Sequence, residues 1–143
     1  MTRAHDHVRN TLRAHDLRCT PQRELIYASL AARHTHPTAE ELLGAVREHQ
    51  PGLSLATVYN ALEAFTHAGL VRRIAPAGGV GPCRYDADIH DHLHAALPDG
   101  RVVDLPPGLA AGLRAATGVG FRESLAAHLA MPVQEIEVRV IVR

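Results

Sequence analysis

Three histidines stand at alternate positions, His90, His92 and His94, with four aspartates around them. The aspartates are Asp86, Asp88, Asp91 and Asp104. In an extended strand alternate side chains point to the same face, so the three imidazoles would lie together. Imidazole and carboxylate form the mixed nitrogen and oxygen ligand set that suits divalent Mn, Fe, Co, Ni or Zn. The pattern predicts a metal site; the plainer alternative is a solvated polar loop.

The composition indicates one or two small globular domains. The chain has 143 residues, of which 46% are hydrophobic, enough for a real core. No run of about 18 apolar residues occurs, so we expect no membrane span. The first seven residues lack the apolar core of a signal peptide, and we therefore expect a cytoplasmic protein.

The cysteines and the charge exclude some classes of protein. Cys19 and Cys83 are the only cysteines and form no CxxC pair, so one chain cannot build a structural zinc site from four cysteines. The formal net charge is zero, which argues against strong non-specific binding to nucleic acid. A local basic face remains compatible with this balance.

The first part of the chain predicts a winged helix-turn-helix. Three of its expected helices have N-capping residues, Thr20, Thr38 and Ser54. The helices are expected at 3–16, 20–32, 38–49 and 54–68, and two strands at 70–74 and 83–86 flank a turn rich in Gly and Pro. In this architecture the fourth helix enters the major groove and the ribbon lies beside the phosphates.

The polar face of the expected fourth helix carries Thr57, Tyr59, Asn60 and Glu63. Asn can pair through two hydrogen bonds with adenine, and Tyr can reach a phosphate or a thymine methyl. Arg72, on the following strand, is placed for phosphate contact. The plainer alternative is that Tyr59 packs internally and Asn60 is merely solvated.

The remainder predicts a small α/β domain. A strand–turn–strand signal covers 95–105, short helices are expected at 108–116 and 122–130 with an interruption at 118–120, and 135–142 alternates as a half-buried strand does. Exposed sheet edges would favour dimerisation by sheet pairing. The predicted class is α+β, with a winged-helix domain at 1–86 followed by an α/β dimerisation domain at 87–143.

Several segments resemble the ferric uptake regulator (Fur) family of repressors, most densely over 12–105. They are Leu17-Arg18-Cys19-Thr20-Pro21-Gln22-Arg23, His36-Pro37-Thr38-Ala39-Glu40-Glu41, Leu55-Ala56-Thr57-Val58-Tyr59-Asn60-Ala61-Leu62, Ala68-Gly69-Leu70-Val71-Arg72 and His92-Leu93-His94. The resemblance implies a homodimeric, metal-activated repressor that binds double-stranded operator DNA, with its regulatory metal at the hinge between domains.

Carried over by position, the resemblance implies particular residues. The metal ligands would be His36, Asp86, His92, His94 and Asp104. The DNA-binding residues would be Arg18, Ser54, Thr57, Tyr59, Asn60 and Arg72. The six-residue step from Asp86 to His92, the Tyr59-Asn60 pair and an Asp at 104 resemble the peroxide-sensing branch (PerR). That branch implies Mn or Fe as the metal, with His36 and His92 as targets of peroxide when Fe is bound.

The chain also departs from the family pattern. Most members carry two CxxC pairs for a structural zinc, which this chain lacks, so we expect a dimerisation domain without that zinc. The alignment of the histidine tract with the family motif leaves two registers open. The two central metal ligands could be His90 and His92 instead of His92 and His94. A nickel-sensing branch of the family uses three alternating histidines together with one that resembles His36, so His90, His92 and His94 could all bind; a nickel or zinc sensor is therefore the alternative. A metal-independent winged-helix regulator and an enzyme with a mononuclear site are two further alternatives, and we expect no enzymatic activity.

Overall fold

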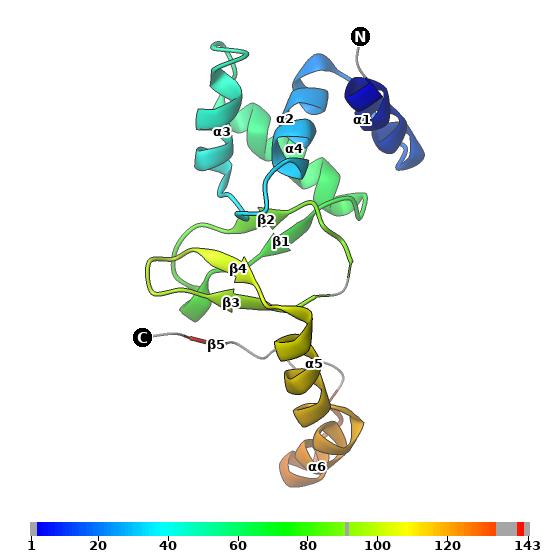
Figure 1. Cartoon of the computed structure of the whole chain (residues 1–143), viewed down its shortest axis with the longest axis vertical. Helices are drawn as coiled ribbons and strands as arrows, with labels where there is room; N and C mark the ends of the chain where they lie inside the picture. The colour runs from blue at the N-terminus through cyan, green and yellow to red at the C-terminus, as the bar shows by residue number, and fades with distance from the viewer. Residues whose placement is uncertain (1–2, 91, 134–139, 142–143) are drawn as a thin grey trace. The chain divides into compact units, whose positions relative to one another are not determined.

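The computed structural model describes residues 3–90, 92–133 and 140–141 of the chain (Figure 1). Internal contacts divide the chain into two units, Met1–His90 and Asp91–Arg143. The first unit combines four helices with a two-stranded ribbon, and the second combines a three-stranded sheet with two helices. The predicted α+β class, with a winged-helix domain followed by a small α/β domain, is confirmed.

The helices of the first unit are α1 (Arg3–Ala14), α2 (Pro21–Ala31), α3 (Ala39–Arg47) and α4 (Leu55–His67). The three predicted caps are confirmed, because the side chains of Thr20, Thr38 and Ser54 each accept a hydrogen bond from a backbone N–H at the start of the next helix. At α3 the cap is reciprocal: Glu41 accepts from the Thr38 N–H at 3.1 Å.

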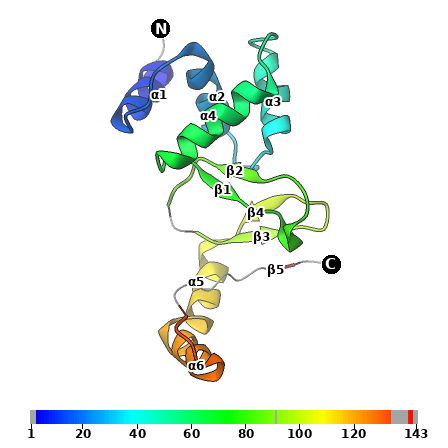
Figure 2. The same ribbon diagram turned by 180° about the vertical axis from the view of Figure 1, so that it is seen from behind.

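The core of the first unit lies where α4 packs against α2 and α3 (Figure 2). Its fully enclosed side chains, each 0% exposed, are Leu12, Ile26, Leu30, Leu42, Val58, Leu62 and Phe65. The rings of Tyr27 and Phe65 meet edge to face, with centroids 5.7 Å apart. The face of α4 opposite this core is therefore left for other contacts.

An ion pair and two apolar side chains hold α1 to α2. Val8 and Leu12 are buried, and the Arg9 Nε donates to the Glu24 carboxylate at 2.9 Å. Glu24 is only 4% exposed, so its charge needs a partner of this kind. The same contact raises the pKa of Arg9 above its ordinary value.

The wing follows α4 directly. Gly69 has a φ of 74°, the left-handed conformation predicted for it, and turns the chain into the ribbon. Strands β1 (Arg72–Ile74) and β2 (Arg84–Asp86) pair antiparallel, and the short 3-10 helix η1 (Ala77–Gly79) lies between them. The ribbon is shorter than the expected 70–74 and 83–86, because only three residues of each strand enter the ladder.

In the second unit the sheet has the order β4-β3-β5. Strands β3 (His94–Ala96) and β4 (Val102–Asp104) are antiparallel, and their register pairs His94 with Asp104. Strand β5 (Val140–Ile141) runs parallel to β3, a pairing that requires a crossover connection. Helices α5 (Pro107–Ala116) and α6 (Val119–Leu129) lie in that connection.

Three sequence expectations need revision. His90 and His92 do not lie in a strand, because β3 begins only at His94. Helix α6 begins at Val119, three residues earlier than the expected 122, and therefore contains Gly120. Gly118 is extended and occupies the N-cap position, so the break between the two helices is shorter than the expected 118–120. The expected strand at 135–142 falls largely outside the described residues, which include only 140–141 of it.

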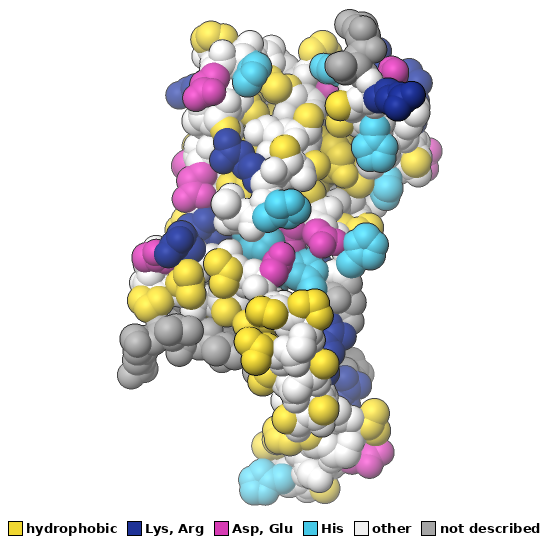
Figure 3. Space-filling view, viewed as in Figure 1, with side chains coloured by type: hydrophobic (Ala, Val, Ile, Leu, Met, Phe, Trp, Pro, Cys, Tyr) yellow, Lys and Arg dark blue, Asp and Glu magenta, His cyan; other side chains and the backbone are white. Residues whose placement is uncertain are grey.

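The two helices of the second unit expose much apolar surface (Figure 3). The large exposed side chains on and beside them are Leu109, Val119, Phe121, Leu129 and Met131. None of the described residues of α6 is buried. No described helix combines the length and hydropathy needed to span a membrane.

The two phenylalanines of the chain offer a matched test of this core. Phe65 is 0% exposed in the first unit, whereas Phe121 is 47% exposed in the second. Phe65→Ala should lower the free energy of unfolding of the first unit by about 3–5 kcal/mol, because it opens a cavity among packed side chains. Phe121→Ala should leave that transition in place. Urea unfolding followed by circular dichroism measures both, and equal losses would contradict the described core.

Candidate metal-binding side chains and DNA-reading face

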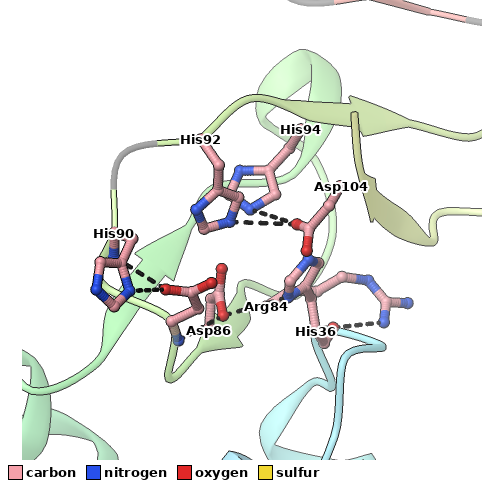
Figure 4. Close-up of polar contacts among 8 residues, drawn as sticks. His36, Arg84, Asp86, His90, His92, His94 and Asp104 are labelled. Carbon is pink, nitrogen blue, oxygen red and sulfur yellow. Dashed lines mark hydrogen bonds and ion pairs between the residues drawn. The ribbon is translucent and has the colours of Figure 1, made fainter. Parts of the chain in front are cut away.

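Two buried polar side chains of the first unit form one candidate pair of metal ligands. His36 lies between α2 and α3, and Asp86 ends β2. The His36 Nδ1 is 3.6 Å from the Asp86 Oδ1, and the two side chains are only 2% and 4% exposed (Figure 4). An imidazole and a carboxylate buried together are suited to sharing a cation.

The backbone around His36 is unusual and is held by β2. His36 has a φ of 48°, a left-handed conformation that costs a residue with a Cβ about 1–2 kcal/mol. Arg84 offsets this cost by donating from Nη1 to the His36 carbonyl at 3.0 Å. The Tyr85 N–H also donates to the Pro37 carbonyl at 3.0 Å. Strand β2 therefore positions His36 as well as carrying Asp86.

Arg84 also reaches α3. Its Nη1 lies 3.1 Å from the Glu41 Oε2, the same oxygen that accepts the Thr38 N–H. One carboxylate thus closes the cap of α3 and pairs with the guanidinium that supports His36. The capping-box spacing in the sequence predicts the first of these contacts, but nothing in the sequence predicts the second.

In the second unit His92 and His94 converge on Asp104. The Nε2 atoms of His92 and His94 lie 3.2 Å and 3.3 Å from the same carboxylate oxygen, Asp104 Oδ1 (Figure 4). The two imidazole rings meet edge to face with centroids 4.5 Å apart. The register of β3 and β4 explains the arrangement, because it places His94 directly opposite Asp104.

His90 has a different partner. Its Nδ1 is 2.7 Å from the Asp88 Oδ1, and its side chain is 93% exposed. Its backbone N–H donates to the same Asp88 oxygen at 3.0 Å. Asp88 in turn is connected to Asp86, whose Oδ1 accepts the Asp88 N–H at 2.8 Å. His90 thus lies in a local turn held by aspartates, and Asp91 falls outside the described residues.

Each unit supplies an incomplete ligand set. The first unit offers one imidazole and one carboxylate, and the second offers two imidazoles and one carboxylate whose ligand atoms lie within 4.8 Å of one another. Divalent transition metals in proteins take four or more ligands, and water can fill positions that side chains leave open, so an ion on either set alone would keep open positions. Both sets consist of the donor types that suit such ions.

The residues expected to bind DNA lie on and around α4. The Ser54 Oγ accepts the Thr57 N–H at 3.2 Å and lies 2.8 Å from the Thr57 Oγ1, so these two hydroxyls are joined at the helix start. Asn60 is exposed on the same helix. Tyr59 is 40% exposed and so is not packed internally.

The two arginines expected to bind DNA lie outside α4. Arg18 is exposed just before α2. Arg72 begins β1, and its Nη2 donates to the Ile89 carbonyl at 3.1 Å. An arginine guanidinium carries five N–H donors, so this single contact leaves Arg72 donors for a phosphate.

A groove of about 520 Å³ separates α4 from the ribbon. Its lining includes Tyr59, Glu63, His67, Arg73, Cys83 and Tyr85. Tyr59 stands at this groove with its hydroxyl donating to the Glu40 Oε1 at 3.0 Å. The bond to a carboxylate raises the pKa of Tyr59 above its ordinary value. The sequence carried no signal for this contact between α3 and α4.

Comparison with known proteins decides the family. The family model described as "Ferric uptake regulator family" matches residues 14–106. The chain belongs to the ferric uptake regulator family. Thus the resemblance inferred from the sequence motifs is confirmed.

Among relatives of this Fur-family chain, the peroxide-responsive repressor PerR of Staphylococcus saprophyticus is 40% identical over 95 residues. That alignment covers 66% of this chain and 63% of the relative. The Campylobacter jejuni peroxide stress regulator is 27% identical with a TM-score of 0.59, covering 99% of this chain and 96% of its own. The Pseudomonas aeruginosa ferric uptake regulator with manganese is 27% identical with a TM-score of 0.65, covering 94% of this chain and 96% of its own.

The contacts of Arg84 allow a stability test. Arg84→Gln should lower the free energy of unfolding of the first unit by about 1–3 kcal/mol, because the His36 carbonyl and the Glu41 carboxylate lose a charged donor. Arg33→Gln is the matched control, since Arg33 is exposed close to the same loop. Urea unfolding compares the two variants. A loss no larger than that of the control would show that Arg84 does not support the loop.

Proposed function

We propose that this Fur-family chain is a metal-dependent transcriptional repressor that binds one divalent ion through His36, Asp86, His92, His94 and Asp104. The observation that carries the proposal is the division of ligand-type side chains between the two units. An ion shared by both sets would be bound by five side chains, whereas an ion on one set would need water or another ligand to complete its coordination. The proposal assigns DNA binding to 1–86 and pairing of two chains to 87–143.

The regulatory logic follows from this shared ion. A cation bound to both units is stabilised only when they adopt one mutual arrangement, so binding shifts the population toward that arrangement. If DNA prefers the same arrangement, metal raises the affinity of the protein for DNA. By linkage, DNA then raises the affinity of the protein for metal by the same factor. When bound, the metal would supply charge and ligand geometry; the protein side chains supply the coupling.

We propose Mn or Fe as the ion. Two carboxylates beside three imidazoles form a mixed oxygen and nitrogen set, which these hard to intermediate ions accept. Nickel or zinc is the second candidate, and it would be favoured if His90 joined His92 and His94 as a third neighbouring imidazole. Neither proposal includes a zinc held by four cysteines, since the chain contains only two cysteines.

The similarity to PerR supports peroxide as the signal to which the proposed repressor responds. The Staphylococcus saprophyticus relative is named a peroxide-responsive repressor. If these residues held iron, the ion would supply redox chemistry toward peroxide, which manganese in the same ligand set would not. Peroxide should therefore abolish DNA binding of the Fe-loaded chain and spare that of the Mn-loaded chain.

DNA contact is assigned to the exposed face of α4 and to two arginines beside it. Asn60 is exposed and carries both a donor and an acceptor, the pair that adenine presents in the major groove. The hydroxyls of Ser54 and Thr57 lie at the N-terminus of α4, where phosphate oxygens bind well. Arg18 and Arg72 are assigned to the backbone of double-stranded DNA.

Pairing of two chains is assigned to the second unit. Its helices expose the large apolar side chains Leu109, Val119 and Phe121, and protein partners commonly cover exposed apolar surface. A two-fold dimer would present two copies of α4 to two half-sites of one operator. As a regulator of this type, the protein is assigned to the cytoplasm and is given no enzymatic role.

The decisive experiment measures metal and DNA binding together. The wild-type chain loaded with MnCl2 should select specific duplexes from a randomised library, and its affinity for them should follow metal occupancy. His92→Ala should reduce metal affinity by about 10-fold or more, by loss of one ligand, and should weaken metal-dependent DNA binding. His49→Ala is the matched control, since His49 is exposed near the end of α3.

Two comparisons complete this test. Comparison of His90→Ala with His94→Ala decides the register, because only the loss of a true ligand should lower the metal affinity. Size-exclusion chromatography with light scattering should show that His92→Ala leaves the dimer intact. Metal-independent DNA binding by the wild-type chain would contradict the sensor and support a plain winged-helix regulator.

A further inference from the structure

A hydrogen bond joins α3 to Tyr59, a residue on the face of α4 to which DNA contact is assigned. The Tyr59 hydroxyl donates to the Glu40 Oε1 at 3.0 Å across 19 residues of sequence. Both side chains are solvent-accessible, so burial does not force them together. An exposed tyrosine without such a contact would exchange between rotamers. The contact therefore selects one orientation of the phenol.

The backbone that carries Glu40 is firmly held. Glu40 lies in the first turn of α3, and the next residue, Glu41, accepts from the Thr38 N–H and from Arg84. A carboxylate in the first turn is also favoured by the helix dipole. Glu40 thus offers a charged acceptor from a fixed position, and charged acceptors make the stronger hydrogen bonds.

We propose that Glu40 is a positioning residue that orients Tyr59 for sequence-specific DNA contact; this rests on the proposed function. With its proton directed to Glu40, the Tyr59 hydroxyl cannot also donate that proton to a phosphate. The carboxylate further disfavours a phosphate next to the phenol through like-charge repulsion. The contact with Glu40 thereby favours contact of Tyr59 with DNA bases, which carry the sequence information, over contact with the DNA phosphates.

Removal of Glu40 has two separable effects. Loss of a negative charge should raise affinity for any DNA, because electrostatic attraction to phosphates is insensitive to sequence. Loss of the acceptor should free Tyr59 to turn toward a phosphate and so reduce discrimination. The informative quantity is therefore the ratio of affinities for specific and scrambled DNA, not either affinity alone.

Glu40→Ala and Glu40→Gln separate these effects. Both remove the charge, but glutamine keeps an oxygen that can accept the phenolic proton. The probes are a duplex selected by the Mn-loaded wild-type chain and a scrambled duplex of the same composition. Glu40→Ala should lower the affinity ratio by about 10-fold, the scale of one base contact, and Glu40→Gln should restore much of it. Glu48→Gln, at the exposed end of α3, controls for charge.

Two further measurements exclude a merely structural role. In a Tyr59→Phe background, Glu40→Ala should no longer change the affinity ratio, because the hydroxyl that Glu40 holds is absent. NMR titration of tyrosines labelled at Cζ, without DNA, should show that Glu40→Ala lowers the raised pKa of Tyr59. The Tyr27 and Tyr85 signals should not shift to a similar extent.

The outcomes distinguish this inference from the function on which it rests. If the wild-type chain selects no duplex with Mn, the proposed function fails. If the wild-type chain discriminates and Glu40→Ala discriminates equally well, only the role of Glu40 is overturned. An unchanged Tyr59 titration in Glu40→Ala would likewise overturn the contact on which the role depends.

Discussion

The guanidinium of Arg84 is the contact that joins the loop at His36 to the start of α3. It holds the left-handed backbone of His36 through its carbonyl and pairs with the carboxylate that caps α3. Because Arg84 lies two residues before Asp86, the same short strand sets the position of both candidate ligands in this unit. A displacement of β2 would therefore move His36, Asp86 and the start of α3 together.

The first turn of α3 lies between the candidate ligand His36 and the face of α4 to which DNA contact is assigned. Glu41 contacts Arg84 on the side of His36, and its neighbour Glu40 contacts Tyr59 on the side of α4. Both contacts start from adjacent residues in the first turn of one capped helix, so the backbone between them is helical and not a flexible loop. This is a continuous physical connection, and its energetic coupling is what the variants at Arg84 and Glu40 measure.

Local patterns predicted the local features well. The caps at Thr20, Thr38 and Ser54 and the left-handed Gly69 follow from residue types at fixed spacings, which the sequence displays directly. The partners of Arg84 lie 43 and 48 residues away, and no spacing rule reaches that far. The alternation of the three histidines suggested a strand, but an aspartate-rich turn competes for the backbone at His90 and the ladder begins at His94.

The division of ligands between the units explains why such a protein could act as a switch. If all five side chains belonged to one rigid unit, an ion would bind without regard to the other unit, and binding would shift no equilibrium. In the proposed site, His36 and Asp86 come from one unit and His92, His94 and Asp104 from the other, so an ion would gain all five side chains only when both units bind it. Under the proposed function, this division of ligands is what would couple metal binding to the arrangement of the first unit.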